Sequence, residues 1–464
     1  MYGYSDVIAA VSTPPGKGGV AVIRISGSGA VEVAEKVFFP VSQKRLTEYA
    51  PRTAVYGSII SDGEVIDDGL ATLFPAPGSY TGEDTVEVSC HGGILVTRCV
   101  LEAIFRAGAR PAAAGEFTRR AALSGKLSLT EAEQIATLLE ARTREEIRLS
   151  SAPARQKLLE KIGEIRKQLV DLMSSVYARI DYPDEDLGEF DDTELLARLN
   201  NIKVKIERLL ATYRTGRAVT EGISAAICGR PNVGKSSLYN LLVGEDAAIV
   251  TDIPGTTRDV LEHTAPLGRV LLRLYDTAGI RDGESIDAVE RIGIERSRQK
   301  MQECELLFAI FDISEPLCDK DKEIIESTKS LSSAKIAILN KCDLEPKFDK
   351  KVLEPHFDYV IEISAKCGEE NAILALSSAV DALFTDEKIR LGEDAVLSSA
   401  RQHATLTRAL DFTTAAITSL EVGFSQDAAS SDIERALGAI SELDGRAVSE
   451  EVVSDIFSKF CVGK

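Results

Sequence analysis

The N-terminal quarter of the chain alternates short β-branched runs with segments rich in glycine and proline. Residues 20–25 read Val-Ala-Val-Ile-Arg-Ile and follow the turn-forming segment 14–19, and residues 85–88 lie between two further turn-forming segments. Short β-branched runs bounded by such signals are typical of strands. The pattern therefore predicts an α+β domain over residues 1–118.

From about Thr130 the apolar positions recur at steps of three and four, which places them on one face of a helix. One stripe comprises Leu158, Ile162, Ile165, Leu169, Leu172, Val176 and Ile180. A second comprises Leu195, Leu199, Ile202, Ile206 and Leu209. The acidic segment 181–189, which contains proline and glycine, predicts a connection between them. We expect helical sequence over 119–217.

Helical periodicity returns from about residue 395, where Ile433, Leu437 and Ile440 form another amphipathic stripe. The segment between, residues 218–383, follows a different pattern. Because a loop insertion costs little free energy when its ends lie close together, the economical interpretation is a discontinuous α-helical domain. It would comprise 119–217 and 384–464, with an α/β domain inserted at 218–383.

Length and composition fit a multidomain globular chain. At roughly 150 residues per domain, 464 residues suggest about three domains. Hydrophobic residues make up 44% and charged residues 27%, and no apolar run is long enough to cross a bilayer. The eight cysteines form no Cys-x-x-Cys pair, which argues against disulfide stapling and structural zinc. We expect a cytoplasmic protein with no membrane partner.

The formal net charge of −19 has the wrong sign for a protein that coats nucleic acid with its whole surface. A local basic patch stays open, because five cations fall in one short stretch. They are Arg106, Arg110, Arg119, Arg120 and Lys126. The alternative for such a cluster is a solvated helix face.

Residues 229–236, Gly-Arg-Pro-Asn-Val-Gly-Lys-Ser, match the phosphate-loop pattern G-x-x-x-x-G-K-[ST]. Such a loop directs backbone N–H groups and its lysine at a nucleotide's phosphates and its hydroxyl at Mg²⁺. The alternative is a glycine-rich turn before a helix. The context favours the phosphate loop, since 223–228 reads as a buried strand and 237–242 as the start of a helix.

Two later segments extend this interpretation. The apolar run 270–275 leads into Asp276-Thr277-Ala278-Gly279, the position of a Walker-B aspartate. The run 336–339 leads into Asn340-Lys341-Cys342-Asp343, where the Asp343 carboxylate can accept both N–H donors on the guanine edge; adenine offers no such pair. Together with Ser364-Ala365-Lys366, these motifs predict a GTPase of the translation-factor class.

The catalytic details differ from a Ras-like pattern. Ile280 stands where a glutamine would orient the attacking water, so another group must do so. Thr257 is a suitable Mg²⁺ ligand. The Asn232 amide oxygen suits an additional cation beside the phosphates, although an asparagine in a loop is also a common turn former.

These motifs and their flanks resemble the MnmE/TrmE family of tRNA-modification GTPases over essentially the whole chain. The resemblance rests on segments 13–19, 24–27, 80–84, 91–93, 115–121, 181–185, 229–236, 255–259, 290–295 and the terminal Cys461-Val462-Gly463-Lys464. It implies a homodimer with an N-terminal tetrahydrofolate-binding and dimerisation domain, a discontinuous helical domain and an inserted G domain.

The resemblance also implies a function. The family acts with a flavin-containing partner, MnmG/GidA, to install a carboxymethylaminomethyl- or aminomethyl-type group on C5 of the wobble uridine (U34) of certain tRNAs. It uses K⁺-stimulated GTP hydrolysis and a one-carbon donor, 5,10-methylene- or 5-formyl-tetrahydrofolate. The expected cofactors are therefore GTP, Mg²⁺, K⁺ and this folate.

Site residues follow position by position. K⁺ would be held by Asn232, Thr251, Ile253 and Thr256, and Mg²⁺ by Ser236 and Thr257. Glu290 would orient the attacking water. The expected GTP contacts are Asn232, Val233, Gly234, Lys235, Ser236, Ser237, Thr251, Asp252, Ile253, Pro254, Gly255, Thr256, Thr257, Asp276, Thr277, Ala278, Gly279, Asn340, Lys341, Cys342, Asp343, Ser364, Ala365 and Lys366.

The matching folate positions are Arg24, Glu87, Lys126 and Lys464. A pterin edge offers paired donors to a carboxylate, and the glutamate tail of folate needs cations. Taken alone, Glu87 also reads as a solvent-facing strand residue and Arg24 as a surface ion pair. Cys461 would lie near the one-carbon donor, where a thiolate can act as nucleophile or carrier.

The main rival is a ribosome-assembly GTPase switch of the Era/Der type. Proteins of this type share the G-domain motifs, but they also contain either a KH-type RNA-binding module with G-x-x-G or a second phosphate loop. The sequence has neither. A third reading, a membrane-associated GTPase, calls for a basic amphipathic helix or a lipidation motif, which are also missing from the sequence.

Overall fold

The computed structural model describes residues 6–181, 192–243, 262–275, 302–366, 369–443, 456–457, 460 and 463. The chain divides into two compact units. The first comprises Met1–Leu139, Ile162–Leu195 and Asp411–Lys464, and the second Glu140–Lys161 and Leu196–Leu410. The expected glutamate Glu290, the thiol Cys461 and the terminal Lys464 lie outside the described residues.

The first unit contains a seven-stranded sheet in the order β3-β4-β5-β6-β2-β1-β7. Its strands are β1 Ile8–Val11, β2 Val20–Ser26, β3 Phe38–Pro40, β4 Ala54–Ser61, β5 Glu64–Phe74, β6 Thr85–His91 and β7 Arg110–Pro111. All neighbouring pairs are antiparallel except β1 and β7. The predicted strands at 20–25 and 85–88 are confirmed as parts of β2 and β6.

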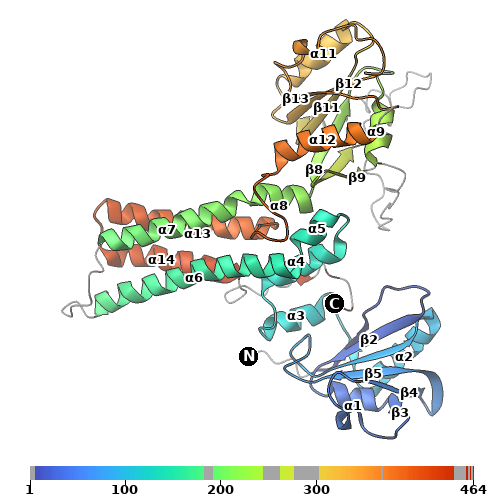
Figure 1. The fold of residues 1–464 in the computed structure, drawn as a ribbon. Helices are drawn as coiled ribbons and strands as arrows, with labels where there is room; N and C mark the ends of the chain where they lie inside the picture. The colour runs from blue at the N-terminus through green and yellow to red at the C-terminus, as the bar shows by residue number, and fades with distance from the viewer. Residues whose placement is uncertain are drawn as a thin grey trace, which may run out of the picture. The chain divides into compact units, whose positions relative to one another are not determined.

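Helices α1 (Ala30–Glu35) and α2 (Ile94–Ala107) cover one face of this sheet, as Figure 1 shows. Alternate strand residues such as Ile23, Val88 and Ile59 are buried against them. On the opposite face, Ile8 and Ala10 of β1 pack with Phe117 of α3 (Glu116–Leu123). The sheet therefore has one fully covered face and one that is covered only in part, where polar side chains can gather.

The helical stripes predicted from the sequence are buried. Helices α6 (Ala152–Asp181) and α7 (Asp192–Ala211) carry the two stripes, and every stripe residue from Leu158 to Val176 and from Leu195 to Leu209 is buried. Among the described residues, further helices are α4 Leu129–Glu140, α5 Arg144–Leu149, α8 Tyr213–Thr220, α13 Ala400–Glu421 and α14 Gln426–Leu443. In α14, Ile433 and Ile440 are buried while Leu437 is half-buried.

The second unit contains a six-stranded sheet in the order β13-β12-β11-β8-β10-β9. Its strands are β8 Ile223–Cys228, β9 Glu262–Leu267, β10 Val270–Tyr275, β11 Leu306–Asp312, β12 Ala334–Asn340 and β13 Tyr359–Glu362. Five strands are parallel, and the edge strand β9 is antiparallel to β10. The sequence predicted β8 and β10 with these bounds.

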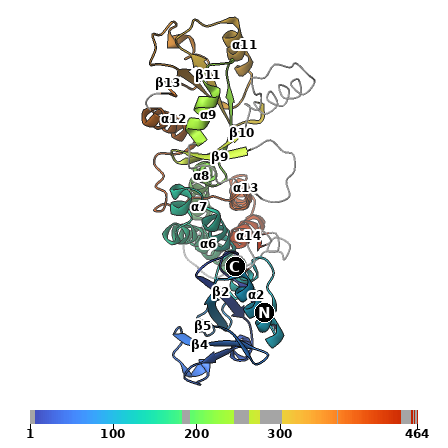
Figure 2. The ribbon, with the colours of Figure 1, turned by 90° about the vertical axis from the view of Figure 1, so that its right-hand side faces the viewer.

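Helices cover both faces of this sheet. Helices α9 (Lys235–Val243) and α12 (Glu369–Phe384) pack on one face, and α11 (Asp319–Thr328) packs on the other. Figure 2, turned by 90°, shows the same layering with β11 between α9 and α11. Because parallel strands are buried on both faces, β8 and β11 read as continuous apolar runs.

None of the described helices is long and apolar enough to cross a bilayer.

Candidate functional site

The phosphate-loop sequence forms a strand, loop and helix. Strand β8 is buried throughout at the centre of the sheet, and the loop leads from it into α9. Asn232 and Gly234 of the loop lie in the left-handed region, with φ of 65° and 105°. The Lys235 ammonium donates to the carbonyls of Gly229 (3.1 Å) and Arg230 (3.0 Å), so the lysine lies over the loop. This is the local structure that the motif predicts.

Asn340, at the end of β12, connects three of the predicted nucleotide motifs. Its side-chain amide donates to the carbonyl of Val233 over 2.7 Å, and its side-chain oxygen accepts the N–H of Ala365 over 3.0 Å. A Cβ on Gly234 would lie 2.1 Å from the Asn340 amide nitrogen, so this loop position has room only for glycine. Asn340 is 4% exposed. The buried amide therefore fixes the phosphate loop against the segment that ends at Lys366.

Next to Asn340 the chain turns outward. Lys341 has a φ of 65°, and its ammonium binds the carboxylate of Asp312 at the end of β11. Burial alone would raise the pKa of Asp312, but hydrogen bonds from Lys341 and Ser314 outweigh it and lower that pKa. Asp343 is exposed two residues further along. These groups gather at the carboxyl ends of parallel strands, where α/β sheets bind their ligands.

The remaining described nucleotide positions lie around this centre. Val233 and Ser364 are buried, and Ala365 is half-buried. Ser236 and Ser237 are exposed in the first turn of α9, and Cys342 and Lys366 are exposed. The first N–H groups of a helix have no partner within the helix, so the start of α9 presents donors beside the Ser236 hydroxyl. The donors suit phosphate, and an exposed hydroxyl suits Mg²⁺.

Arg24 and Glu87, which the sequence placed separately, form one pair on the N-terminal sheet. They are register partners on β2 and β6. Both Nε and Nη2 of Arg24 lie 2.9 Å from Oε1 of Glu87. The side chains are 16% and 28% exposed. Among the described residues, side-chain hydrogen bonds reach only Oε1, so Oε2 of the carboxylate is available to a ligand.

Two aromatic rings hold the Arg24 guanidinium. Its Cζ lies 5.3 Å from the centroid of the Tyr80 ring and 5.5 Å from that of Phe117. The Tyr80 hydroxyl is within 2.9 Å of the Thr118 hydroxyl, which fixes the ring. Such cation–π contacts contribute roughly 0.5–2 kcal/mol each. The motif segments 80–84 and 115–121 contain both rings, but nothing in their local pattern showed that they meet at Arg24.

Lys126 is tied to the segment that carries Tyr80. Its ammonium donates to the carbonyl of Pro77 over 2.9 Å, and its Cγ would lie 3.3 Å from a Cβ on Gly82. Ser124 donates to the carbonyl of Thr81 over 2.7 Å. Ser124 and Lys126, which follow α3, therefore hold the loop that precedes β6 in place. The same loop carries Tyr80, the ring that contacts Arg24.

Known proteins match nearly the whole length of the chain. The family "MnmE helical domain" matches residues 129–461, and the family "GTP-binding protein TrmE N-terminus" matches residues 7–126. The tRNA modification GTPase MnmE of Natranaerobius thermophilus is 38% identical over 461 residues, 99% of each chain. The protein of the same name from Thermotoga petrophila is 38% identical over 464 residues, 99% of this chain and 100% of its own length.

The chain belongs to the MnmE family of tRNA modification GTPases. The resemblance seen in the motifs is therefore confirmed, as is the prediction of a GTPase. Among solved structures, the chain is similar to Aquifex aeolicus Era bound to GDP and AlF4⁻, at 24% identity over 41% of this chain and 66% of that chain. The TM-score of 0.28 is too low to support a conclusion about the fold.

Several expected residues of this MnmE family member lie outside the described part of the chain. They are Thr251, Asp252, Ile253, Pro254, Gly255, Thr256, Thr257, Asp276, Thr277, Ala278, Gly279, Glu290, Cys461 and Lys464. Their roles stay predictions.

The basic stretch of the N-terminal domain is largely neutralised by its own acids. Arg120 is 2% exposed and bonds Asp6, Glu83 and Glu116. Arg110 bonds Asp6 and Glu116. Burial raises the Glu116 pKa, but the hydrogen bonds from Arg110, the Ala113 N–H and Arg120 together outweigh it and lower that pKa. The buried Arg120 cannot contribute to a surface that binds nucleic acid. Part of the basic cluster predicted from the sequence, Arg110 and Arg120, therefore belongs to an ion-pair network with Asp6, Glu83 and Glu116.

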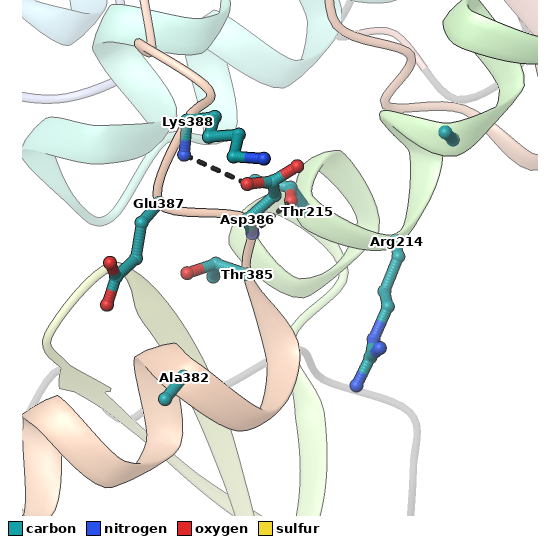
Figure 3. A pocket seen from close by; sticks show the side chains of 8 residues that line it. Arg214, Thr215, Ala382, Thr385, Asp386, Glu387 and Lys388 are labelled. Atoms are coloured by element: carbon teal, nitrogen blue, oxygen red, sulfur yellow. Dashed lines mark hydrogen bonds between the residues drawn. The ribbon is translucent and has the colours of Figure 1, made fainter.

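A cavity of about 490 Å³ lies in the second unit, between α8 and the end of α12. Figure 3 shows Thr215 of α8 beside Asp386, whereas the Arg214 side chain, also from α8, points away from Asp386 and Lys388. The Thr215 hydroxyl accepts the N–H of Asp386 over 2.9 Å. The lining contains both acidic and basic side chains and shares no residue with the expected nucleotide or folate positions. The cavity therefore lies where α8 packs against the chain that follows α12 and is separate from both expected sites.

Proposed function

We propose that this protein is the GTP-hydrolysing component of a complex that modifies C5 of the wobble uridine, U34, in tRNA. The product would be an aminomethyl- or carboxymethylaminomethyl-type group, made with a tetrahydrofolate one-carbon donor and the flavin-containing partner MnmG/GidA. Membership of the MnmE family supports the tRNA substrate. The observation that carries the proposal is the Asn340 amide, which joins the phosphate loop to the guanine-binding motifs.

Guanine would be recognised by Asp343. The exposed carboxylate follows the Asn340 bridge by three residues, on the turn that the Lys341–Asp312 pair supports. It can accept two N–H donors at once, which guanine offers and adenine does not. Backbone N–H groups at Ser364–Lys366 would serve the guanine oxygen. The phosphates would lie on the loop residues 232–237, with Lys235 moving from its loop carbonyls to the outer phosphates.

Two cations would complete the nucleotide site. Ser236 and Thr257 would hold Mg²⁺, and the exposed Ser236 hydroxyl at the start of α9 fits this role. Asn232, Thr251, Ile253 and Thr256 would hold K⁺. Asn232 is exposed, and its backbone lies in the left-handed region. The cations would supply positive charge to the phosphates, and Glu290 would orient the attacking water.

Tetrahydrofolate would bind at the Arg24–Glu87 pair. Oε2 of Glu87 suits the paired N–H donors of a pterin, while the hydrogen bonds from Arg24 orient the carboxylate. Lys126 and Lys464 would serve the carboxylates of the folate tail. Cys461 would act on the one-carbon unit as a thiolate nucleophile or carrier. The half-buried position of the pair and its contact with two aromatic rings favour a ligand site over an isolated surface ion pair.

The domain organisation follows from the same proposal. Residues 1–118 would bind folate and form the homodimer, 119–217 and 384–464 the helical domain, and 218–383 the G domain. We place the protein in the cytoplasm. An Era/Der-type ribosome-assembly switch is not favoured, because relatives that match 99% of the chain carry the MnmE name.

Reconstitution tests the proposal. Purified protein, the flavin partner, GTP, K⁺, folate and undermodified tRNA should yield the modified wobble nucleoside on nucleoside analysis. Cys461→Ser should lose the modification and retain GTP hydrolysis. If the wild-type protein does not bind 5-formyl-tetrahydrofolate saturably, the folate part of the proposal is wrong. If it does not prefer GTP to ATP, the proposed guanine recognition is wrong.

A further inference from the structure

The C-terminal end of the chain contacts the N-terminal sheet. The Ser12 hydroxyl donates to the carbonyl of Gly463 over 3.1 Å, although 451 positions separate the two residues. Gly463 has a φ of 102°, and a Cβ there would lie 2.1 Å from the carbonyl oxygen of Val11. This close approach requires glycine. The backbone of Gly463 therefore lies directly against the end of β1.

The contact is on the same side of the sheet as the Arg24–Glu87 pair. The Ser12 N–H donates to the carbonyl of Val22 over 2.7 Å, which extends the β1–β2 pairing by one residue. Ala10 is the register partner of Arg24. Side chains alternate between faces along a strand, so Ser12 shares a face with Ala10 and hence with Arg24. Diagonal neighbours of this kind lie about 7–8 Å apart.

A second contact fixes the chain just before the tail. Phe457 and Phe460 are 2% and 7% exposed and pack with Leu129 and Ala132 of α4. Gly115, with a φ of 63°, makes room for them, because a Cβ there would lie 2.6 Å from the Phe457 carbonyl oxygen and 2.9 Å from the Phe460 Cβ. The described residues on either side of positions 461 and 462 are thus both anchored within the first unit.

We propose that Ser12 is a positioning residue, which docks the C-terminal tail on the sheet before folate binds. The inference rests on the proposed folate function and adds the residue that orders the tail. A ligand that contacts an already ordered segment loses less conformational entropy on binding. Ser12 therefore acts on folate affinity through the tail and has no contact with folate.

A double-mutant cycle tests this role. The full-length protein and a form lacking Lys464 are each prepared with serine, alanine or threonine at position 12, and titrated with 5-formyl-tetrahydrofolate. In the full-length protein, Ser12→Ala should raise Kd between about twofold and tenfold, the range for one hydrogen bond. Ser12→Thr keeps the hydroxyl and should retain the wild-type Kd. Without Lys464, Ser12→Ala should have no effect.

The docking itself is measured without folate. Carboxypeptidase B should release Lys464 between about twofold and tenfold faster from Ser12→Ala than from the wild type, and faster still from Gly463→Ala, which clashes with Val11. Ser58→Ala, on β4 of the same sheet, is the matched control and should change neither readout.

Two results would overturn the inference. An equal effect of Ser12→Ala on Kd with and without Lys464 would mean that Ser12 acts on the sheet or on folate directly. An unchanged rate of Lys464 release would mean that the hydroxyl does not hold the tail. If the wild-type protein fails to bind folate at all, the proposed folate function is wrong, and the release rates still decide whether Ser12 docks the tail.

Discussion

The side-chain amide of Asn340 donates to the main-chain carbonyl of Val233 and joins residues 107 positions apart. On its other side the amide accepts from Ala365. One buried side chain thus sets the spacing between the loop for the phosphates and the segment for the base. A nucleotide that spans both would find this spacing already fixed, so Asn340 contributes to nucleotide affinity without needing to touch the nucleotide.

Asn340→Ala should therefore weaken GTP binding, because the phosphate loop would no longer be held at a fixed distance from the segment that contains Ala365. It leaves the Val233 carbonyl and the Ala365 N–H without their partner, at a cost of about 1–3 kcal/mol for each buried group. We expect at least a tenfold rise in Kd for a fluorescent GTP analogue, and faster amide exchange at Ala365. Asn371→Ala, at an exposed position in α12, is the control. Unchanged exchange at Ala365 in Asn340→Ala would contradict the bridging role.

Asp343→Asn should change the base that is bound. The amide keeps one acceptor but presents an N–H to guanine, whereas xanthine carries a carbonyl at that edge and can accept it. Two hydrogen bonds to a charged group are worth roughly 1.5–3 kcal/mol each, so GTP affinity should fall by about 100-fold or more. XTP affinity should rise above that of the wild type in competition titrations. Asp319→Asn, also exposed, should leave both affinities unchanged; a similar loss there would point to a general charge effect.

Arg24→Lys should weaken folate binding. Lysine keeps the charge but offers neither the planar fork that lies on Glu87 nor the surface that lies between Tyr80 and Phe117. We expect a rise in the Kd of 5-formyl-tetrahydrofolate of about tenfold and an unchanged rate of GTP hydrolysis. Tyr80→Leu should act in the same direction through the lost cation–π contact. The control is Arg98→Lys, in an exposed pair with Glu102. Wild-type affinity in Arg24→Lys would show that folate does not depend on the fork.

The sequence predicted those parts of the fold whose pattern is local. Strand β8 is buried throughout and β10 is mostly buried, so both are predominantly apolar, and the α6 stripe repeats at helical spacing because one face is buried. The antiparallel edge strand β9 was not predicted, because Glu262–Leu267 mixes polar and apolar residues without a clear alternation.

The candidate sites divide in the same way. The phosphate loop is contiguous and was read directly from the sequence. The Arg24–Glu87 pair depends on the register of two strands whose paired residues are 63 positions apart, and the Tyr80 and Phe117 rings approach Arg24 from two further segments. Packing and register bring these four side chains together, and no spacing along the chain encodes their contacts.

His91 and Asp67 give the N-terminal sheet a pH-dependent contact. The imidazole Nδ1 lies 2.8 Å from Oδ1 of Asp67. The hydrogen bond with Asp67 raises the pKa of the exposed His91, with further help from the charges of Asp67 and Asp68. Burial alone would raise the pKa of Asp67, but hydrogen bonds from the backbone and ring of His91 outweigh it and lower that pKa.

The signs define a pH window for His91→Gln. A histidine whose pKa is higher in the folded state stabilises the fold. This stabilisation is complete below the unfolded-state pKa of about 6.5 and is lost as pH rises through the folded-state pKa. An aspartate whose pKa is lower in the folded state also stabilises the fold. This stabilisation is complete above the unfolded-state pKa of about 3.9 and is lost as pH falls through the folded-state pKa. His91→Gln should thus speed amide exchange in β5 and β6 most between about pH 4 and 6.5, and little above about pH 8. The readout is the variant-to-wild-type ratio of exchange rates at each pH, with His356→Gln as control. A ratio that stays constant across this range would show that the pair carries no charge-dependent stability.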